Sequence, residues 1–453
     1  MRKVSILLFA TILLFACKTN DKTEPANTSD GEHTDWVYDA AIYEVNVRQY
    51  TSEGTFSAFE QHIPRLKDLG VDILWFMPIQ SIGKVERKGS LGSYYSIKNY
   101  TEVNSEFGTL ADFRSVVDKA HASGMKVILD WVANHSSRDG VWLENEDWYV
   151  TDSLGNVVAP YDWSDVAKLN YENDAMRDAM VQSMLWWVRE ADIDGFRCDV
   201  AGEVPTDFWL RVTDSIKSVK PNIFMLAEAE KPELNDKAFD AFYAWDFHHK
   251  MNSVAQGKEN VDSLRASLNR INDNFSPRAI PMYFTSNHDE NSWNGTEFER
   301  MGDAAATFAA LSYVLPGMPL IYSGQEVGFN RRLEFFEKDN IDWASAANKS
   351  ELTELYKNLN AFKKSNLALF TQEKGGEMVE IANNMPEKVW SFKRVKGENE
   401  VHCVFNFSDE NVVVAFDQPI SGGDFKEFYN AANSQSKESV ELKTWEYKLY
   451  YKK

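Results

Sequence analysis

Cysteine and positive charge are both scarce in this chain. Only 3 of the 453 residues are cysteine, and 48 Lys and Arg stand against 69 Asp and Glu, which gives a formal net charge of -21. A negative surface repels phosphates, so the charge argues against a nucleic-acid partner and favours a neutral ligand. Aromatic residues are plentiful by contrast, at 13%, enough to line a groove as well as to fill cores.

The cysteines are too few and too far apart for a disulfide framework or a metal site. Cys198 and Cys403 lie in regions of different sequence pattern. We expect both to be small buried apolar side chains.

Long hydrophobic runs are also missing, except at the N-terminus, where MRK precedes VSILLFATILLFA. This run is typical of a secretory signal and too short to span a bilayer permanently. LFAC (14–17) resembles a bacterial lipobox, which predicts that Cys17 is lipidated; an ordinary signal peptide cut slightly later is the alternative. Residues 18–35 lack apolar periodicity and are predicted to be a flexible tether. We therefore expect a membrane-anchored lipoprotein in the periplasm or on the outer-membrane surface.

From Ala41 onward, short apolar runs of β type alternate with helical patterns. Strands are expected at 41–47, 72–77, 126–131, 195–200, 223–228, 239–244, 281–286 and 319–324. Helical spacing of apolar residues is found at 55–70, 109–124, 174–191 and 205–219. Eight such units predict a closed parallel (β/α)₈ barrel, and the number of units disfavours the alternative, a doubly wound open sheet.

Two segments depart from this alternation. Residues 136–173, between the third strand and its helix, carry turn signals and several aromatics, and predict a small subdomain inserted at the barrel mouth. After 375 the pattern changes to alternating strands and turns, as in KVWSFKRV. We expect a catalytic-type barrel over 36–374 and a C-terminal β-sandwich domain over 375–453.

Polar side chains cluster where the expected strands end, which is where (β/α)₈ barrels form their sites. In GFRCDVA (195–201), Arg197 and Asp199 share one strand face. An isolated pair of this kind is more often a structural ion pair. Other strand ends supply Asp130, Asn134, His135, Glu228, His288 and Asp289. Like charges gathered at one mouth destabilise a fold, so their convergence indicates a functional site.

Carboxylate pairs are the groups that hydrolyse glycosidic bonds, one as general acid and the other as nucleophile or base. Arg197 is expected to keep Asp199 ionised by direct attraction. The charge of Asp199 would in turn raise the pKa of Glu228 toward that of a usable acid.

Five motifs, DWVANH, AKLN, GFRCDVA, LAEAE and FTSNHDEN, resemble in order, spacing and strand context those of the α-amylase family, glycoside hydrolase family 13. The resemblance covers residues 36–453. It implies that Asp199 is the nucleophile, Glu228 the acid/base, and Asp289 a third carboxylate that binds sugar hydroxyls. It also implies that His135 and His288 bind the sugar at the cleavage subsite.

GSYYSIKNY (92–100) is similar to the family segment whose tyrosine stacks under that sugar, which implies Tyr95, with Tyr94 as the neighbouring alternative. Asn99 stands where the family usually has Asp, and Ala227 where glycine is common. GEVPTDFW, after Asp199, lacks the Lys-His pair of starch α-amylases and resembles the neopullulanase and cyclomaltodextrinase branch. In relatives an asparagine at position 134 helps to bind structural calcium; support of the strand end is the simpler role for Asn134.

The sequence therefore predicts a retaining hydrolase of α-glucosidic, mainly α-1,4, bonds in maltooligosaccharides or starch-like glucans, with no cofactor needed for the chemistry. A transglycosylase with the same residues is one alternative, because a sugar can replace water as acceptor. A non-catalytic glucan-binding lipoprotein is another. It is disfavoured because a pure binder gains nothing from a buried acid pair.

Overall fold

The computed structural model describes residues 33–346, 350–433 and 437–453. The expected signal segment and the lipidated Cys17 lie outside the described residues, and membrane anchoring stays a prediction. Within the described ranges, no helix is both long enough and apolar enough to cross a bilayer.

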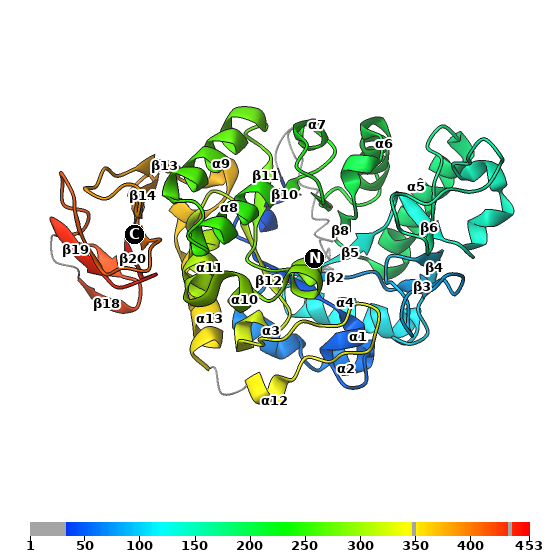
Figure 1. The fold of residues 1–453 in the computed structure, drawn as a ribbon, viewed down its shortest axis with the longest axis horizontal. Coiled ribbons are helices and arrows are strands. Elements are labelled where there is room, and N and C mark those ends of the chain that lie inside the picture. Colours follow the sequence, from blue (N-terminus) through cyan, green and yellow to red (C-terminus); the bar gives the residue numbers. More distant parts are fainter. Residues whose placement is uncertain (1–32, 347–349, 434–436) are drawn as a thin grey trace, which may run out of the picture.

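Eight parallel strands form a closed barrel, which confirms the predicted fold (Figure 1). They are β1 (Ile42–Val45), β2 (Ile73–Phe76), β5 (Lys126–Trp131), β8 (Gly195–Cys198), β9 (Phe224–Ala227), β10 (Ala241–Tyr243), β11 (Ile280–Tyr283) and β12 (Met318–Tyr322). The order around the barrel is β1-β12-β11-β10-β9-β8-β5-β2. Most strands are shorter than expected, and Val47, expected in the first strand, begins a helix.

Helices cover the outside of the barrel (Figure 1). Their bounds are α1 (Val47–Tyr50), α2 (Phe56–Glu60), α3 (Ile63–Leu69), α4 (Leu110–Ala122), α5 (Asp174–Ala191), α6 (Thr206–Lys217), α7 (Pro232–Asn235), α8 (Trp245–Ala255), α9 (Val261–Asn274), α10 (Glu297–Met301), α11 (Ala305–Val314), α12 (Trp343–Ala346) and α13 (Ser350–Ser365). The single helix expected over 55–70 is wrong. Pro64 lies in the first turn of α3, where its missing N–H costs nothing, so a new helix starts there instead of α2 continuing.

The predicted tether ends earlier than residue 35. His33 and Thr34 are buried, and the His33 ring nitrogens contact Asp240 Oδ1 at 2.8 Å and the Arg278 carbonyl oxygen at 2.6 Å. The side chain of His33 thus fixes the chain to the barrel before β1, a contact that local periodicity does not indicate.

Two short hairpins flank the barrel mouth. One pairs β3 (Gln80–Ile82) with β4 (Ile97–Val103), and the other pairs β6 (His135–Ser137) with β7 (Val166–Lys168). The second hairpin lies in the insert between β5 and α5. Both place loops beside the ends of the barrel strands.

The C-terminal region folds as two sheets at one end of the molecule, next to α11 and α13 (Figure 1). The larger sheet has the order β13-β14-β15-β20-β17-β18, with β13 (Glu377–Glu380), β14 (Val389–Lys396), β15 (Asn399–Asn406), β20 (Tyr447–Lys452), β17 (Lys426–Glu427) and β18 (Asn430–Asn433). The smaller one pairs β16 (Val412–Ala415) with β19 (Ser439–Leu442). A cluster that includes Val404, Val414 and Val440 packs between them.

Candidate active site

Arg197 lies at the centre of the polar cluster at the barrel mouth. Its guanidinium is fully buried. Nη1 donates to Asp130 Oδ1 at 3.0 Å and to Asp199 Oδ1 at 3.2 Å, and Nη2 forms an ion pair with Glu228 Oε2 at 2.9 Å. The predicted contact between Arg197 and Asp199 is present, and the same guanidinium also compensates Asp130 and Glu228.

Asp199 and Glu228 are neighbours because their strands are neighbours. β8 pairs with β9 in a register that sets Cys198 beside Ala227, and the two acids are the next residues on each strand. Val200 has φ of 35°, a left-handed conformation that is rare for a β-branched residue. Its N–H donates to Glu228 Oε2 at 2.7 Å. A strained turn after β8 thus fixes one carboxyl oxygen of Glu228.

Burial raises the pKa of both acids. For Asp199 the charge of Glu228 raises the pKa further while Arg197 lowers it, and the sum lies well above the usual value. For Glu228, burial raises the pKa by more than Arg197 lowers it. Because the two carboxyls repel each other, loss of a proton by one raises the pKa of the other, and they titrate as a pair. Such a pair can hold one proton near neutral pH, which is what an acid and a nucleophile together require.

His288 and Tyr95 form a hydrogen-bond chain beside these acids. His288 Nδ1 lies 2.5 Å from Glu44 Oε1, and its Nε2 lies 2.8 Å from the Tyr95 hydroxyl and 3.3 Å from Asp289 Oδ2. Burial alone would lower the pKa of His288, but Asp289 and Glu44 raise it to about 9. The ring is therefore a cation that donates from both nitrogens, and the Tyr95 hydroxyl donates onward to Asp130 Oδ2 at 3.0 Å.

His135 differs from His288 in charge. It is buried in the same cavity without a carboxylate partner among the described residues, and burial lowers its pKa to about 3. The neutral ring packs edge-on against Trp163 at 5.4 Å and lies 3.3 Å from the Asn134 amide. One histidine at the mouth is thus cationic and the other neutral.

Tyr95, not Tyr94, lines the cavity. The ring of Tyr94 lies under the Arg48 guanidinium, 4.2 Å from its centroid, and is buried elsewhere in the core.

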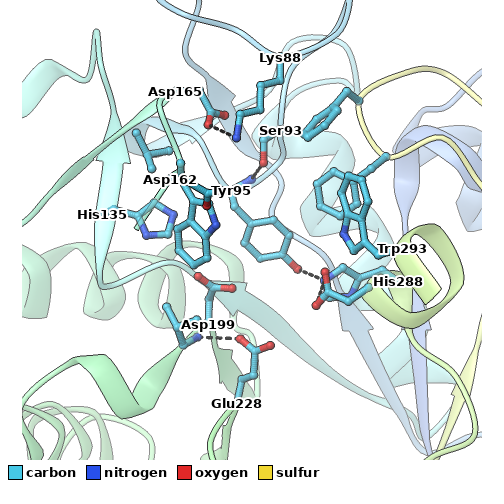
Figure 2. A pocket seen from close by; sticks show the side chains of 16 residues that line it. Lys88, Ser93, Tyr95, His135, Asp162, Asp165, Asp199, Glu228, His288 and Trp293 are labelled. Carbon is cyan, nitrogen blue, oxygen red and sulfur yellow. Dashed lines mark hydrogen bonds and ion pairs between the residues drawn. The ribbon is translucent and has the colours of Figure 1, made fainter. Parts of the chain in front are cut away.

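The expected site residues meet in one cavity of about 420 Å³ (Figure 2). Its lining includes Tyr95, His135, Asp199, Glu228, His288 and Asp289. Arg197 lies beneath this lining and Asn134 beside it. The volume is near the small end of ligand pockets, which run roughly from 300 to 1,000 Å³.

A calcium site at Asn134 gains no support. In the ranges that the structure describes, no group of three or more His, Cys, Asp or Glu side chains is placed to hold a metal ion. The Asn134 amide instead faces His135, so calcium stays a prediction from the resemblance alone.

Glu44 was not foreseen as a site residue. It is fully buried on β1 and contacts His288, which follows β11, two strands away in the barrel. A signal was present, since Glu44 is a lone acid inside an apolar run, and a buried unpaired carboxylate is costly. Asp130 was noted at its strand end, but its contacts with Arg197, Tyr95 and Trp75 Nε1 were not.

Known proteins with similar sequences and structures share this architecture. The family model "Alpha amylase, catalytic domain" matches residues 23–165 and 144–366. The chain is 27% identical over 408 residues to alpha-amylase MalA of Haloarcula japonica, covering 86% of this chain and 58% of that protein. The chain thus spans little more than half of that relative's length.

Two solved structures are similar along nearly their whole length. An alpha-amylase from Lactobacillus plantarum superposes with a TM-score of 0.82 at 29% identity, covering 91% of this chain and 99% of that one. A noncanonic maltogenic alpha-amylase, AmyB, from Thermotoga neapolitana gives the same score and identity, with coverage of 91% and 98%. Because the family model matches most of the barrel region and the acids lie at its mouth, the chain belongs to the α-amylase family of glycoside hydrolases.

Proposed function

We propose that this protein is a retaining glycoside hydrolase that cleaves α-glucosidic, mainly α-1,4, bonds of maltooligosaccharides or starch-like glucans. The observation that carries the proposal is the placement of Asp199 and Glu228 on paired neighbouring strands, both in contact with Arg197, in one cavity. Neighbouring strands lie about 4.8 Å apart. That spacing fits the separation of about 5 to 5.5 Å between carboxyl groups in retaining enzymes.

In the first step, a carboxylate oxygen of Asp199 attacks the anomeric carbon. The bond from that carbon to the glycosidic oxygen breaks, and the proton of Glu228 moves to the departing oxygen. Burial raises the pKa of both acids, so the pair can hold one proton. The proposal places that proton on Glu228 and the negative charge on Asp199 beside Arg197, and departure of the proton is eased as Asp199 loses its charge in the ester. A covalent glycosyl-Asp199 intermediate results.

In the second step, the Glu228 carboxylate takes a proton from water. The water oxygen attacks the anomeric carbon, and the ester bond to Asp199 breaks, which restores both acids. Two displacements at one carbon retain the α configuration. Arg197 stays within reach of both acids throughout, so negative charge can shift from one to the other without leaving its cation.

Asp289, Tyr95 and His288 supply the binding surface for the reacting sugar. The Asp289 carboxylate is partly exposed to the cavity and can accept hydrogen bonds from sugar hydroxyls. The cation of His288 and the hydroxyl of Tyr95 hold each other in place. The orientation of the Tyr95 ring is therefore fixed, and its face can stack on a sugar ring.

The test is hydrolysis of maltoheptaose, pullulan and soluble starch by the wild type and Asp199→Asn. The asparagine keeps the shape of the side chain but is a far poorer nucleophile, so reducing-end release should fall at least about a thousandfold. Asp207→Asn, an exposed acid on the next helix, is the matched control and should keep full activity.

Proton NMR of the first product reports the mechanism. An α-anomer supports the double displacement, whereas a β-anomer would show direct attack by water and remove Asp199 from the nucleophile's role. Oligomers longer than the substrate would identify a transglycosylase. Binding of glucan with no cleavage of any of the three substrates would favour the non-catalytic alternative.

A further inference from the structure

Three segments distant in sequence meet along one side of the cavity. The β3–β4 loop carries Lys88, whose Nζ lies 3.2 Å from Asp165 Oδ1 of the insert (Figure 2). Both residues line the cavity. Asp165 is almost fully buried, whereas about a third of the Lys88 side chain is exposed. The ion pair therefore joins two loops at the cavity edge.

The same loop is tied on its other side to the segment after β12. Ser90 N donates to Glu337 Oε1 at 2.7 Å, and Leu91 N donates to the Phe336 carbonyl at 3.1 Å. The Phe336 ring packs 5.8 Å from that of Trp293, which follows Asp289 in the chain. A rim of Asp165, Lys88, Phe336 and Trp293 thus runs along the cavity edge, held by contacts between segments.

The rim is anchored to the insert by more than the ion pair. Ser96 Oγ donates to the Asp165 carbonyl at 3.1 Å, which fixes the backbone beside the carboxylate. Lys98 Nζ on β4 lies 3.5 Å from Asp139 Oδ2, which joins the strand after the Lys88 loop to the insert outside the cavity lining. The loop that carries Lys88 therefore has little freedom to move away from Asp165.

The general acid gives the cavity a direction. Glu228 protonates the glycosidic oxygen, so the part of the chain that leaves extends on the Glu228 side. Figure 2 shows Lys88 and Asp165 on the other side of the Tyr95 ring from Asp199 and Glu228. Tyr161 is 63% exposed, packs 5.0 Å from the cavity-lining Trp163 and contacts Glu203, in the turn after β8 whose Val200 N–H binds Glu228. An aromatic surface is thus available to the leaving chain, while the non-reducing side meets the rim.

Resting on the proposed function, we propose that this rim closes the non-reducing side of the site, so that the enzyme attacks chain ends and releases short products of fixed length. Internal bonds of a glucan would require a chain to continue through the Lys88–Asp165 ion pair and past Trp293. The Lys88 ammonium also faces the cavity and can donate hydrogen bonds to the hydroxyls of a terminal sugar. An internal sugar lacks one of these hydroxyls, because that oxygen forms the next glycosidic bond.

The experiment compares two forms of p-nitrophenyl α-maltoheptaoside, one free and one with its non-reducing end blocked by a 4,6-O-ethylidene group. Cleavage is followed by chromatography. The wild type should cleave the free form at least about tenfold faster than the blocked form, since a rim that fits a chain end rejects added bulk. Lys88→Met with Asp165→Asn opens the rim without a large loss of volume, and should reduce this ratio toward one. Lys88→Met alone should reduce it in part.

Lys98→Met is the matched control, because it removes a lysine on β4 that contacts the same insert outside the cavity; its ratio should equal that of the wild type. Equal cleavage of both forms by the wild type overturns the inference and leaves the proposed function intact. An unchanged ratio in the double variant also overturns it, since the selectivity would then arise elsewhere. Cleavage of neither form would refute the proposed function and the inference together.

Discussion

Buried cations at the barrel mouth and at the domain junction have different partners. At the barrel mouth, Arg197 contacts three carboxylates. Between the barrel and the C-terminal sheets, Arg394 donates to the carbonyl oxygens of Val314, Phe370 and Gly376, and Lys363 donates to those of Gly317 and Leu369. The first cation faces charges and the second pair faces backbone dipoles.

The pKa values separate the two regions. Burial lowers the pKa of Arg197, but Asp130 and Glu228 more than reverse this and raise it well above the usual value. Burial lowers the pKa of Arg394 to about 10, and burial together with Arg394 lowers that of Lys363 to about 7. Carboxylates offset the desolvation free energy of a buried cation, whereas carbonyl groups offset only part of it. The mouth therefore needs its cation for charge balance, and the domain junction needs its cations as hydrogen-bond donors.

Among the buried cations, the largest expected effect comes from Arg197→Met. Three buried carboxylates would lose their cation, and breaking a buried pair in this way costs about 3–5 kcal/mol of folding free energy. Activity should fall at least about a hundredfold, because the paired acids would both bind protons at neutral pH. Urea unfolding and maltoheptaose hydrolysis measure the two effects.

Arg197→Lys serves as the companion variant if the methionine variant does not fold. A point charge cannot reach three carboxylates as a guanidinium does, so activity should stay well below the wild type while most of the stability returns. Full activity in Arg197→Lys would show that the shared contacts are not required.

A smaller effect, confined to stability, is expected for Arg394→Met. The charge at the junction is removed but three carbonyl oxygens lose a donor, for a net cost of about 2 kcal/mol. The kcat/KM for maltoheptaose should stay within about twofold of the wild type, because the site at the mouth is untouched. Loss of activity in a folded Arg394→Met protein would mean that the junction and the mouth are coupled.

The last contrast is a difference in pH dependence between His288 and Lys363. The folded-state pKa of His288 is raised from 6.5 to about 9, so its stabilisation is complete below pH 6.5 and is lost as the pH rises through about 9. The pKa of Lys363 is lowered from 10.5 to about 7, so its cost to the fold is relieved as the pH rises from about 7 to about 10. Each slope is at most about 1.4 kcal/mol per pH unit.

Urea unfolding of the wild type, His288→Gln and Lys363→Met between pH 7 and 9.5 separates these slopes. As the pH rises, the free energy of unfolding of the wild type should fall relative to that of His288→Gln. Relative to that of Lys363→Met it should rise. Two slopes of the same sign would contradict the contrast between a cation held by carboxylates and one held by carbonyls.

Much of the fold could be predicted because it follows from the local spacing of apolar and polar residues. The eight apolar runs, their helical neighbours and the acids at their ends are visible without any contact information, and the observed strands fall within or overlap the expected ranges. One error arose from a contact between distant residues, and another from a local proline that the helical spacing alone does not take into account. His33 is held by Asp240, and the 55–70 segment breaks where Pro64 favours a new helix start.

The sequence by itself determined which residues could carry acid chemistry and on which strands they lie, because side-chain alternation and strand order follow from local geometry and from the parallel barrel. Only the tertiary structure decided how charge is shared among them. Closure of the barrel brings Glu44 to His288, 244 residues away, sets one guanidinium among three carboxylates, and joins Lys88 to Asp165. Such contacts depend on distances between segments, and Coulomb energies at a buried site depend on those distances more than on the identity of the residues.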